Sequence, residues 1–230
     1  MVFGGLQKLS LVDYPNVVAA VVFTQGCLFR CPYCHNPELI SSTNEAGVST
    51  EEVLEYLRHK RVFLDGVCIT GGEPTLHADL PDFMRTLKDL GFSVKLDTNG
   101  ANPQMVQRVI DEGVVDYFAM DIKGTWERYS DFIHIKNEQL IKNCQQTMRI
   151  IQHSGIDHEF RTTVFPSQHQ ISDFYEIAGY LQKGEKYYIQ NIEFKKNLDT
   201  RIDQTLTIDV TQLVSDLQER FPALTIGARQ

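Results

Sequence analysis

The sequence predicts one α/β domain built as a partial, open barrel of parallel strands. Strand-like and helix-like segments alternate along the chain, which is typical of parallel strands joined by crossover helices. Six strand segments, each followed by a helix or a helical loop, lie between Val17 and Ile192. Because a closed barrel of this type needs eight strands, the chain predicts an open (β/α)6 barrel of the TIM type.

Each element has its own local signal. Val17–Thr24 is apolar and β-branched, which predicts a strand buried on both faces. Ser49 and Glu52 form a capping-box pattern that predicts a helix running to about Arg61. The remaining predicted elements are strand Gly66–Thr70, helix Pro81–Leu90, strand Ser93–Asp97, helix Gln104–Glu112, strand Asp116–Ile122, helix Glu138–Ser154, strand His158–Val164, helix Ile171–Leu181, strand Tyr187–Ile192, helix Thr211–Arg220 and a strand near Leu224–Ile226. No linker separates them, so residues 1–230 are predicted to form a single domain with a C-terminal extension over about 195–230.

The composition favours a soluble globular protein over a nucleic-acid-binding or membrane protein. Of the 230 residues, 42% are hydrophobic and 23% charged, and the net charge of -8 lacks the basic footprint of nucleic-acid binding. The longest apolar run, Val17–Phe23, is too short to cross a bilayer, and the N-terminus lacks the pattern of a secretory signal. Five cysteines without such a signal predict a cytoplasmic protein whose clustered thiols bind a metal or act in redox chemistry.

Three of the five cysteines crowd into the loop 24–36 that follows the first predicted strand. Cys27, Cys31 and Cys34 have the spacing C-x3-C-x2-C, and one loop can wrap three thiolates around one iron–sulfur cluster. With three ligands on a four-iron cluster, one iron keeps an open position, as catalytic metal sites do. The alternative is a structural zinc site completed by His35. The other two cysteines, in an apolar strand and on an apolar helix stripe, are interpreted as core residues.

Polar residues follow several predicted strands at their carboxyl ends, where the chemistry of parallel barrels is found. The segment "GGEP" places Gly71, Gly72 and Glu73 after the second strand. Two glycines let a ligand approach the backbone, and the carboxylate offers an acceptor to an ammonium group. The later strands end in Asp97, Asn99, Asp121 and Lys123. For the last two of these, an exposed ion pair of little energetic value is the alternative interpretation.

The cysteine motif with Tyr33 before its last cysteine, followed by "GGEP", resembles the signature of radical S-adenosylmethionine (SAM) enzymes. The resemblance implies a [4Fe-4S] cluster whose open iron binds the amino and carboxylate groups of SAM, with Gly71, Gly72 and Glu73 beside the amino group. It also implies reductive cleavage of SAM to a 5′-deoxyadenosyl radical. Such chemistry belongs to the cofactor, and the protein supplies binding and orientation.

The segments "CPYCHNPEL", "LDTNG" and "MDIK" resemble the glycyl-radical-enzyme activating proteins, most closely the branch that activates anaerobic ribonucleotide reductase. The resemblance implies that Asp97 and Asp121 lie near the cofactor carboxylate, together with a monovalent cation. It further implies that Arg161 lies close to the same carboxylate, which an arginine can bind with two hydrogen bonds. The other cofactor-pocket residues that it implies are Tyr33, Asn36, Asn99 and Lys123.

The function implied by this resemblance is hydrogen abstraction from a glycine of a partner glycyl radical enzyme, an anaerobic ribonucleotide reductase, with flavodoxin or ferredoxin as reductant. The stretch between Asn36 and Glu51 is too short for the ferredoxin-like insert of many other activases. Asn16 stands where the family often has the glycine of D-x-P-G, and asparagine tolerates a positive φ. Two alternatives remain open: a one-cluster radical enzyme acting on a small molecule or peptide, and a zinc-binding or electron-transfer module without catalysis.

Overall fold

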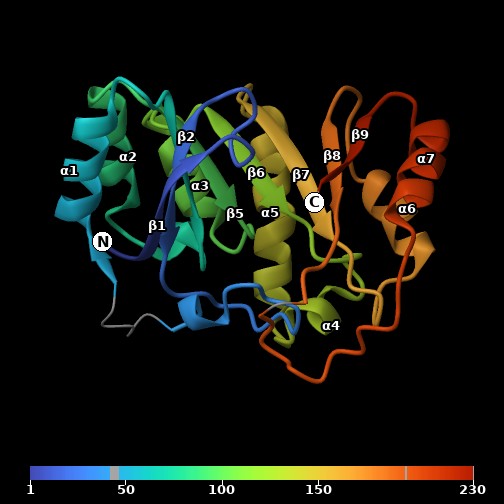
Figure 1. The fold of residues 1–230 in the computed structure, drawn as a ribbon. Helices are drawn as coiled ribbons and strands as arrows, with labels where there is room; N and C mark the ends of the chain where they lie inside the picture. The colour runs from blue at the N-terminus through green and yellow to red at the C-terminus, as the bar shows by residue number, and fades with distance from the viewer. Residues whose placement is uncertain (42–46, 195, 230) are drawn as a thin grey trace.

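The computed structural model of the chain describes residues 1–41, 47–194 and 196–229. Its strands form one sheet flanked by helices, in the order β3-β1-β2-β4-β5-β6-β7-β8-β9 (Figure 1). The strands are β1 (Val2–Ser10), β2 (Ala19–Thr24), β3 (Val48–Ser49), β4 (Gly66–Gly71), β5 (Ser93–Thr98), β6 (Tyr117–Asp121), β7 (Asp157–Thr163), β8 (Lys186–Gln190) and β9 (Thr225–Arg229). The helices are α1 (Thr50–Lys60), α2 (Leu80–Asp89), α3 (Pro103–Asp111), α4 (Tyr129–Ile133), α5 (Glu138–His153), α6 (Ile171–Ala178) and α7 (Val210–Arg220), with short 3-10 helices η1 (Pro37–Leu39) and η2 (Pro74–Leu76).

The parallel part of the sheet follows the order of the chain. Strand β2 pairs with β4, and each later strand through β9 pairs in parallel with the next, while β1 lies antiparallel to β2. The six strands predicted between Val17 and Ile192 are all present, and the open parallel barrel is confirmed. All carboxyl ends of the parallel strands therefore face the same end of the molecule, the lower end in Figure 1.

A local signal predicted the start of α1. Ser49 caps α1 as predicted: its Oγ accepts from the backbone N of Glu52 at 3.2 Å, and a carboxylate oxygen of Glu52 accepts from the backbone N of Ser49 at 2.8 Å. Asn16 adopts a φ of 60°, so the turn expected at this position forms without a glycine. No helix of the described residues is long and apolar enough to span a bilayer.

Two strands, one α-helix and the two short 3-10 helices were not predicted from the sequence. Strand β1 contains glycines and polar residues, so its sequence lacks the apolar pattern of a buried strand. It forms by pairing antiparallel with β2, where Leu6 lies opposite Val22. Strand β3 has only two residues, and α4 has only five, too few for a periodic pattern. The last strand was expected near Leu224–Ile226 but extends to Arg229.

The two faces of the parallel sheet differ in polarity. Val22, Ile69 and Leu96 are fully buried in the hydrophobic core. Alternate residues point to the concave interior of the open barrel, where the buried Lys95 contacts Asp97. The interior of the barrel thus contains charged side chains near the carboxyl ends of the strands, and a small apolar cluster of Tyr14, Ala19 and Tyr117 lies on the same face.

Candidate active site

One cavity of about 330 Å³ lies at the carboxyl ends of the parallel strands, a volume typical of small-molecule sites. The structure brings all the site residues expected from the sequence around this cavity: Cys27, Cys31, Tyr33, Cys34, Asn36, Gly71, Gly72, Glu73, Asp97, Asn99, Asp121, Lys123 and Arg161. Their convergence follows from parallel strands whose ends meet at one edge. Which of them contact a cofactor remains a prediction.

The loop between β2 and η1 places the three thiols. Its backbone is held to the end of η1 by hydrogen bonds from Gly26 N to Leu39 O (2.7 Å) and from Cys27 N to Ile40 O (3.2 Å). Within it, Cys34 N donates to Cys31 O at 3.0 Å. This loop runs along the lower end of the sheet in Figure 1, and we call residues 24–36 the cluster loop.

The chemistry of the cluster loop fits an iron–sulfur cluster. All three cysteines are free thiols that line the one cavity, with Cys31 buried. The sulfur of Cys27 lies 3.4 Å from the backbone N of Phe29 and 3.6 Å from Nδ2 of Asn99, and such donors tune cluster sulfurs. Among the described residues no three His, Cys, Asp or Glu side chains already converge on one metal position. The fit therefore rests on the identity and placement of the thiols.

Burial controls the protonation of these thiols. It raises the pKa of Cys27 to about 11, with a smaller effect from the nearby Glu73, and the pKa of Cys31 to about 12. The cluster-free thiols are therefore protonated at neutral pH, and binding of iron has to displace their protons. His35, the candidate fourth ligand of a zinc site, uses its Nε2 to accept a hydrogen bond from the backbone N of Glu193 at 3.2 Å.

The glycines of "GGEP" hold their turn against the cluster loop. Gly72 N donates to Thr24 O at 2.9 Å, and Glu73 N donates to Gly26 O at 2.7 Å. A Cβ on Gly72 would lie 2.2 Å from Gly26 O, and Gly71 has a φ of 115° with Thr24 N at 2.4 Å from a Cβ. The sequence predicted that these glycines admit a ligand. The structure shows that they also admit the backbone of the cluster loop, while both glycines line the cavity and the approach of a ligand to them stays a prediction.

Glu73 joins the turn after β4 to the turn after β5. Its side chain is fully buried, and its Oε1 accepts from Thr75 N, Thr75 Oγ1 and Thr98 Oγ1 at 3.1, 2.6 and 2.7 Å. Its Oε2 accepts from Asn99 N at 2.7 Å. Because a carboxylate oxygen accepts more than one hydrogen bond, Oε2 has capacity for a further donor from the cavity.

A row of five charged side chains crosses β5, β6 and β7 beside the cavity. Lys95 contacts Oδ1 of Asp97, and Nη1 of Arg161 lies 3.0 Å from Oδ2 of the same carboxylate. Nε of Arg161 lies 2.8 Å from Oδ1 of Asp121, whose Oδ2 lies 2.8 Å from Nζ of Lys123. Each oxygen of the two carboxylates thus has its own nitrogen partner. We call these five side chains the charged row.

The charged row keeps its members ionised. Burial opposes ionisation of Asp121, but Arg161 and Lys123 outweigh it and hold the pKa of this carboxyl well below its usual range. Burial also opposes the charge on Lys123, and Asp121 more than compensates, so the pKa of Lys123 is raised. The Asp121–Lys123 pair is not an exposed surface pair, since the two side chains are 24% and 14% exposed and line the cavity.

Tyr33 offers the cavity an unused hydrogen-bonding group. Its ring packs at 4.9 Å from the ring of Phe165, and its hydroxyl is buried without a hydrogen-bond partner among the described residues. A buried hydroxyl without a partner costs free energy, so its presence in a cavity wall points to a ligand. This observation supports the assignment of Tyr33 to a cofactor pocket.

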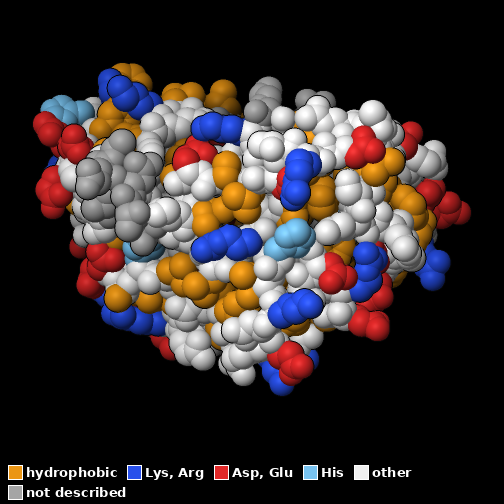
Figure 2. Space-filling model, turned by 90° about the horizontal axis from the view of Figure 1, so that it is seen from below, with side chains coloured by type: hydrophobic (Ala, Val, Ile, Leu, Met, Phe, Trp, Pro, Cys, Tyr) orange, Lys and Arg blue, Asp and Glu red, His pale blue; other side chains and the backbone are white. Residues whose placement is uncertain are grey.

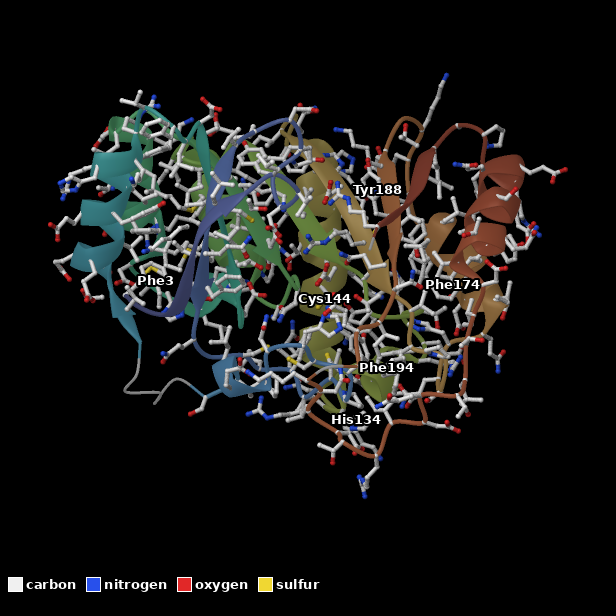
Figure 3. All side chains as sticks on the ribbon, viewed as in Figure 1. Phe3, His134, Cys144, Phe174, Tyr188 and Phe194 are labelled. Carbon is white, nitrogen blue, oxygen red and sulfur yellow. The ribbon has the colours of Figure 1, made fainter. Side chains whose placement is uncertain are left out.

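Sequence reasoning missed the segment that covers the cluster loop from outside. Residues 196–209, which we call the strap, follow β8 and pass below the sheet in Figure 1. Asn197 Nδ2 donates to Tyr33 O at 3.2 Å, and Asp199 N donates to Pro32 O at 2.9 Å. Figure 3 shows His134 and Phe194 at this same lower end of the molecule. No local sequence pattern predicts these contacts, because they join residues far apart in the chain.

The comparisons with known proteins agree with this geometry. The radical SAM superfamily profile matches residues 21–180. A protein of Methanocaldococcus jannaschii assigned as a glycyl-radical enzyme activating enzyme is 32% identical over 198 residues, which cover 85% of this chain and 81% of that protein. The pyruvate formate-lyase 1-activating enzyme of Escherichia coli is 29% identical over 197 residues, which cover 78% of this chain and 76% of that enzyme.

Solved structures share the fold. Streptococcus suis SuiB bound to S-adenosylmethionine superposes with a TM-score of 0.72 at 11% identity, covering 94% of this chain and 52% of that one. QueE from Escherichia coli superposes with a TM-score of 0.54 at 17% identity, covering 100% of this chain and 92% of that one. The chain therefore belongs to the radical SAM superfamily and, within it, to the glycyl-radical-enzyme activating enzymes. Membership of this family implies an enzyme that uses a [4Fe-4S] cluster and SAM.

Proposed function

We propose that this enzyme abstracts a hydrogen atom from a glycine Cα of a partner glycyl radical enzyme. The observation that carries the proposal is one cavity that gathers three thiols, a tyrosine hydroxyl without a partner and the charged row, in a chain whose relatives are activating enzymes. When bound, the [4Fe-4S] cluster supplies the electron that splits a carbon–sulfur bond of SAM and yields a 5′-deoxyadenosyl radical.

Different side chains around the cavity bind the cluster and the carboxylate of SAM. Cys27, Cys31 and Cys34 hold the cluster, and the N–H groups beside the Cys27 sulfur stabilise its thiolate. Arg161 and Lys123 provide the positive charge that the SAM carboxylate requires.

The opposite wall of the cavity receives the other polar groups of the cofactor. Oε2 of Glu73 accepts from the ammonium group, and Asn99 and Asn36 offer amide groups beside the cluster loop. The hydroxyl of Tyr33 donates to a cofactor atom that enters the cavity. The buried position of these groups excludes water from the radical, which would otherwise be exposed to side reactions.

The first candidate partner is an anaerobic ribonucleotide reductase, because "CPYCHNPEL" and "LDTNG" resemble the activases of that branch. The test is to incubate the reconstituted enzyme with SAM, a reductant and the candidate reductase, and to record the glycyl radical by electron paramagnetic resonance. We expect a radical on the reductase with the wild-type enzyme and none with Cys31→Ala. A radical formed on pyruvate formate-lyase alone would overturn the choice of partner. SAM cleavage without a radical on any glycyl radical enzyme would favour the small-molecule or peptide alternative.

The electron donor binds the face seen in Figure 2, close to the cluster loop. Lys, Arg and His side chains lie between hydrophobic ones near the middle of this face. The cluster loop contributes Leu28, which is 44% exposed, and the exposed Arg30, while the adjacent Lys196 has a side chain that is 69% exposed. A reduced flavodoxin or ferredoxin in the cytoplasm is the donor that we propose for this surface.

A further inference from the structure

Lys95 lies in the middle of β5 with its side chain fully buried inside the open barrel. Its ammonium contacts Oδ1 of Asp97, and its Nζ lies 3.7 Å from the sulfur of Cys68. A lysine keeps its charge at such depth only when an anion pairs with it. Asp97 lines the cavity, so Lys95 acts on the cavity through Asp97.

The charged groups near Lys95 set the net charge of this part of the barrel. The three cations and two carboxylates of the charged row leave one net positive charge beside the cavity. Cys68 adds no charge, because burial raises the pKa of its thiol. Glu159 on β7 is paired with Arg229, whose Nη2 lies 2.6 Å from its Oε2. Within the charged row, one positive charge is therefore not balanced by a carboxylate of the row; the other carboxylates that line the cavity are those of Asp13, Glu73 and Glu193.

The charged row already neutralises Asp97 and Asp121, the two carboxylates beside which the resemblance implies a monovalent metal ion. Hard cations bind oxygen ligands, and here each oxygen of the two carboxylates has a nitrogen partner. An added ion would share an oxygen with one of these charged nitrogens, and the repulsion between the like charges disfavours its binding. The charge that such an ion would bring is already present in the chain.

We propose that Lys95 is the resident cation of the cofactor site: its ammonium holds Asp97 in place and supplies the positive charge that an exchangeable Na⁺ or K⁺ would otherwise bring. Lys95 is thus a positioning residue for the SAM carboxylate, and this part of the proposal rests on the proposed function. The enzyme is expected to bind SAM without any requirement for a particular monovalent cation.

The test compares the reconstituted enzyme in sodium, potassium and tetramethylammonium chloride at equal ionic strength. Two quantities are measured in each salt: the affinity for SAM and the midpoint of thermal unfolding without SAM. For the wild-type enzyme we expect the same values in all three salts. For Lys95→Met we expect SAM binding weakened roughly tenfold or more in tetramethylammonium, because an unpaired carboxylate is left buried, and partly restored by sodium or potassium.

Two further variants serve as controls. Lys95→Arg keeps the charge and is expected to remain independent of the cation. Lys88→Met removes a lysine that lies 2.6 Å from Asp116, in a pair whose side chains are 30% and 36% exposed. Solvent reaches that carboxylate, so its variant is expected to respond equally to the three salts.

Several results would overturn the inference. One is a wild-type enzyme whose SAM affinity or unfolding midpoint falls in tetramethylammonium; this comparison holds even if Lys95→Met does not fold. Another is a Lys95→Met variant that binds SAM as the wild type does, or that loses binding which neither sodium nor potassium restores. Absence of SAM binding by the wild type in every salt would instead contradict the proposed function, and the unfolding midpoints without SAM would still decide the role of Lys95.

Discussion

Replacing Glu73 by glutamine tests whether this carboxylate ties the two turns of the cavity together. The amide oxygen of glutamine can keep the three donors on Oε1, from Thr75 and Thr98, but its NH₂ group then faces the backbone N–H of Asn99. One hydrogen bond to a charged acceptor becomes a contact between two donors, which costs about 1–3 kcal/mol when buried. Burial raises the pKa of Glu73, so removing the charge recovers part of this cost. We expect a net loss of about 2 kcal/mol.

The assay is thermal unfolding of the cluster-free chain by circular dichroism at pH 7 under anaerobic conditions. A loss of about 2 kcal/mol lowers the midpoint by roughly 4–8 °C in a chain of this size. Glu52→Gln is the control, because the carboxylate of Glu52 likewise accepts hydrogen bonds, from the backbone N and Oγ of Ser49, but lies on the surface where water can replace them. A Glu73→Gln midpoint equal to the wild-type value, or no lower than that of Glu52→Gln, would refute the reasoning.

Three other predictions concern the surroundings of the cavity. Gly72→Ala places a Cβ 2.2 Å from a backbone oxygen of the cluster loop, so this variant should bind less iron than the wild type on reconstitution. The control Gly5→Ala, whose Cβ has its nearest contact at 3.8 Å, should bind the wild-type amount. Equal iron contents in the two variants would contradict this prediction. Burial lowers the pKa of His169 from 6.5 to about 4. The unfolded state therefore binds a proton at a higher pH than the folded state does, and the free energy of unfolding should fall by about 3 kcal/mol as the pH drops from 6.5 to about 4. Urea titrations should show a shallower fall for His169→Gln, and an identical fall would exclude this histidine as the cause. Asn197→Ala should speed deuterium uptake in the cluster loop, and unchanged uptake would show that the strap does not restrain it.

The sequence predicted the parallel elements and the site because both depend on local patterns. Apolar strands such as Ala19–Thr24 and the Ser49 cap carry their signals within a few residues. Residues at successive strand ends meet at one edge of a parallel sheet, so their convergence on one cavity needs no further information. Cys144 was expected in the core and is fully buried there, with its sulfur 3.4 Å from the backbone oxygen of Asn99.

Features that depend on contacts between distant segments were not predicted. Cys68 is fully buried, as expected for a core residue, but its contact with a carboxylate oxygen of Asp97 at 3.6 Å was not predicted. Lys95 shares this interior, and the only signal for it was a lysine two residues before Asp97 in a strand otherwise expected to be buried. The contacts of the strap with Tyr33 and Pro32 join residues more than 150 positions apart and leave no local pattern.

The most direct test of the account is reductive cleavage of SAM by the purified chain. The enzyme is reconstituted anaerobically with iron and sulfide, reduced with dithionite in the presence of SAM, and assayed for 5′-deoxyadenosine by chromatography. We predict product with the wild-type enzyme and none with Cys31→Ala, which removes a thiol of the cluster loop. Absence of product from a wild-type chain with a fully assembled cluster would contradict the account and favour an electron-transfer module.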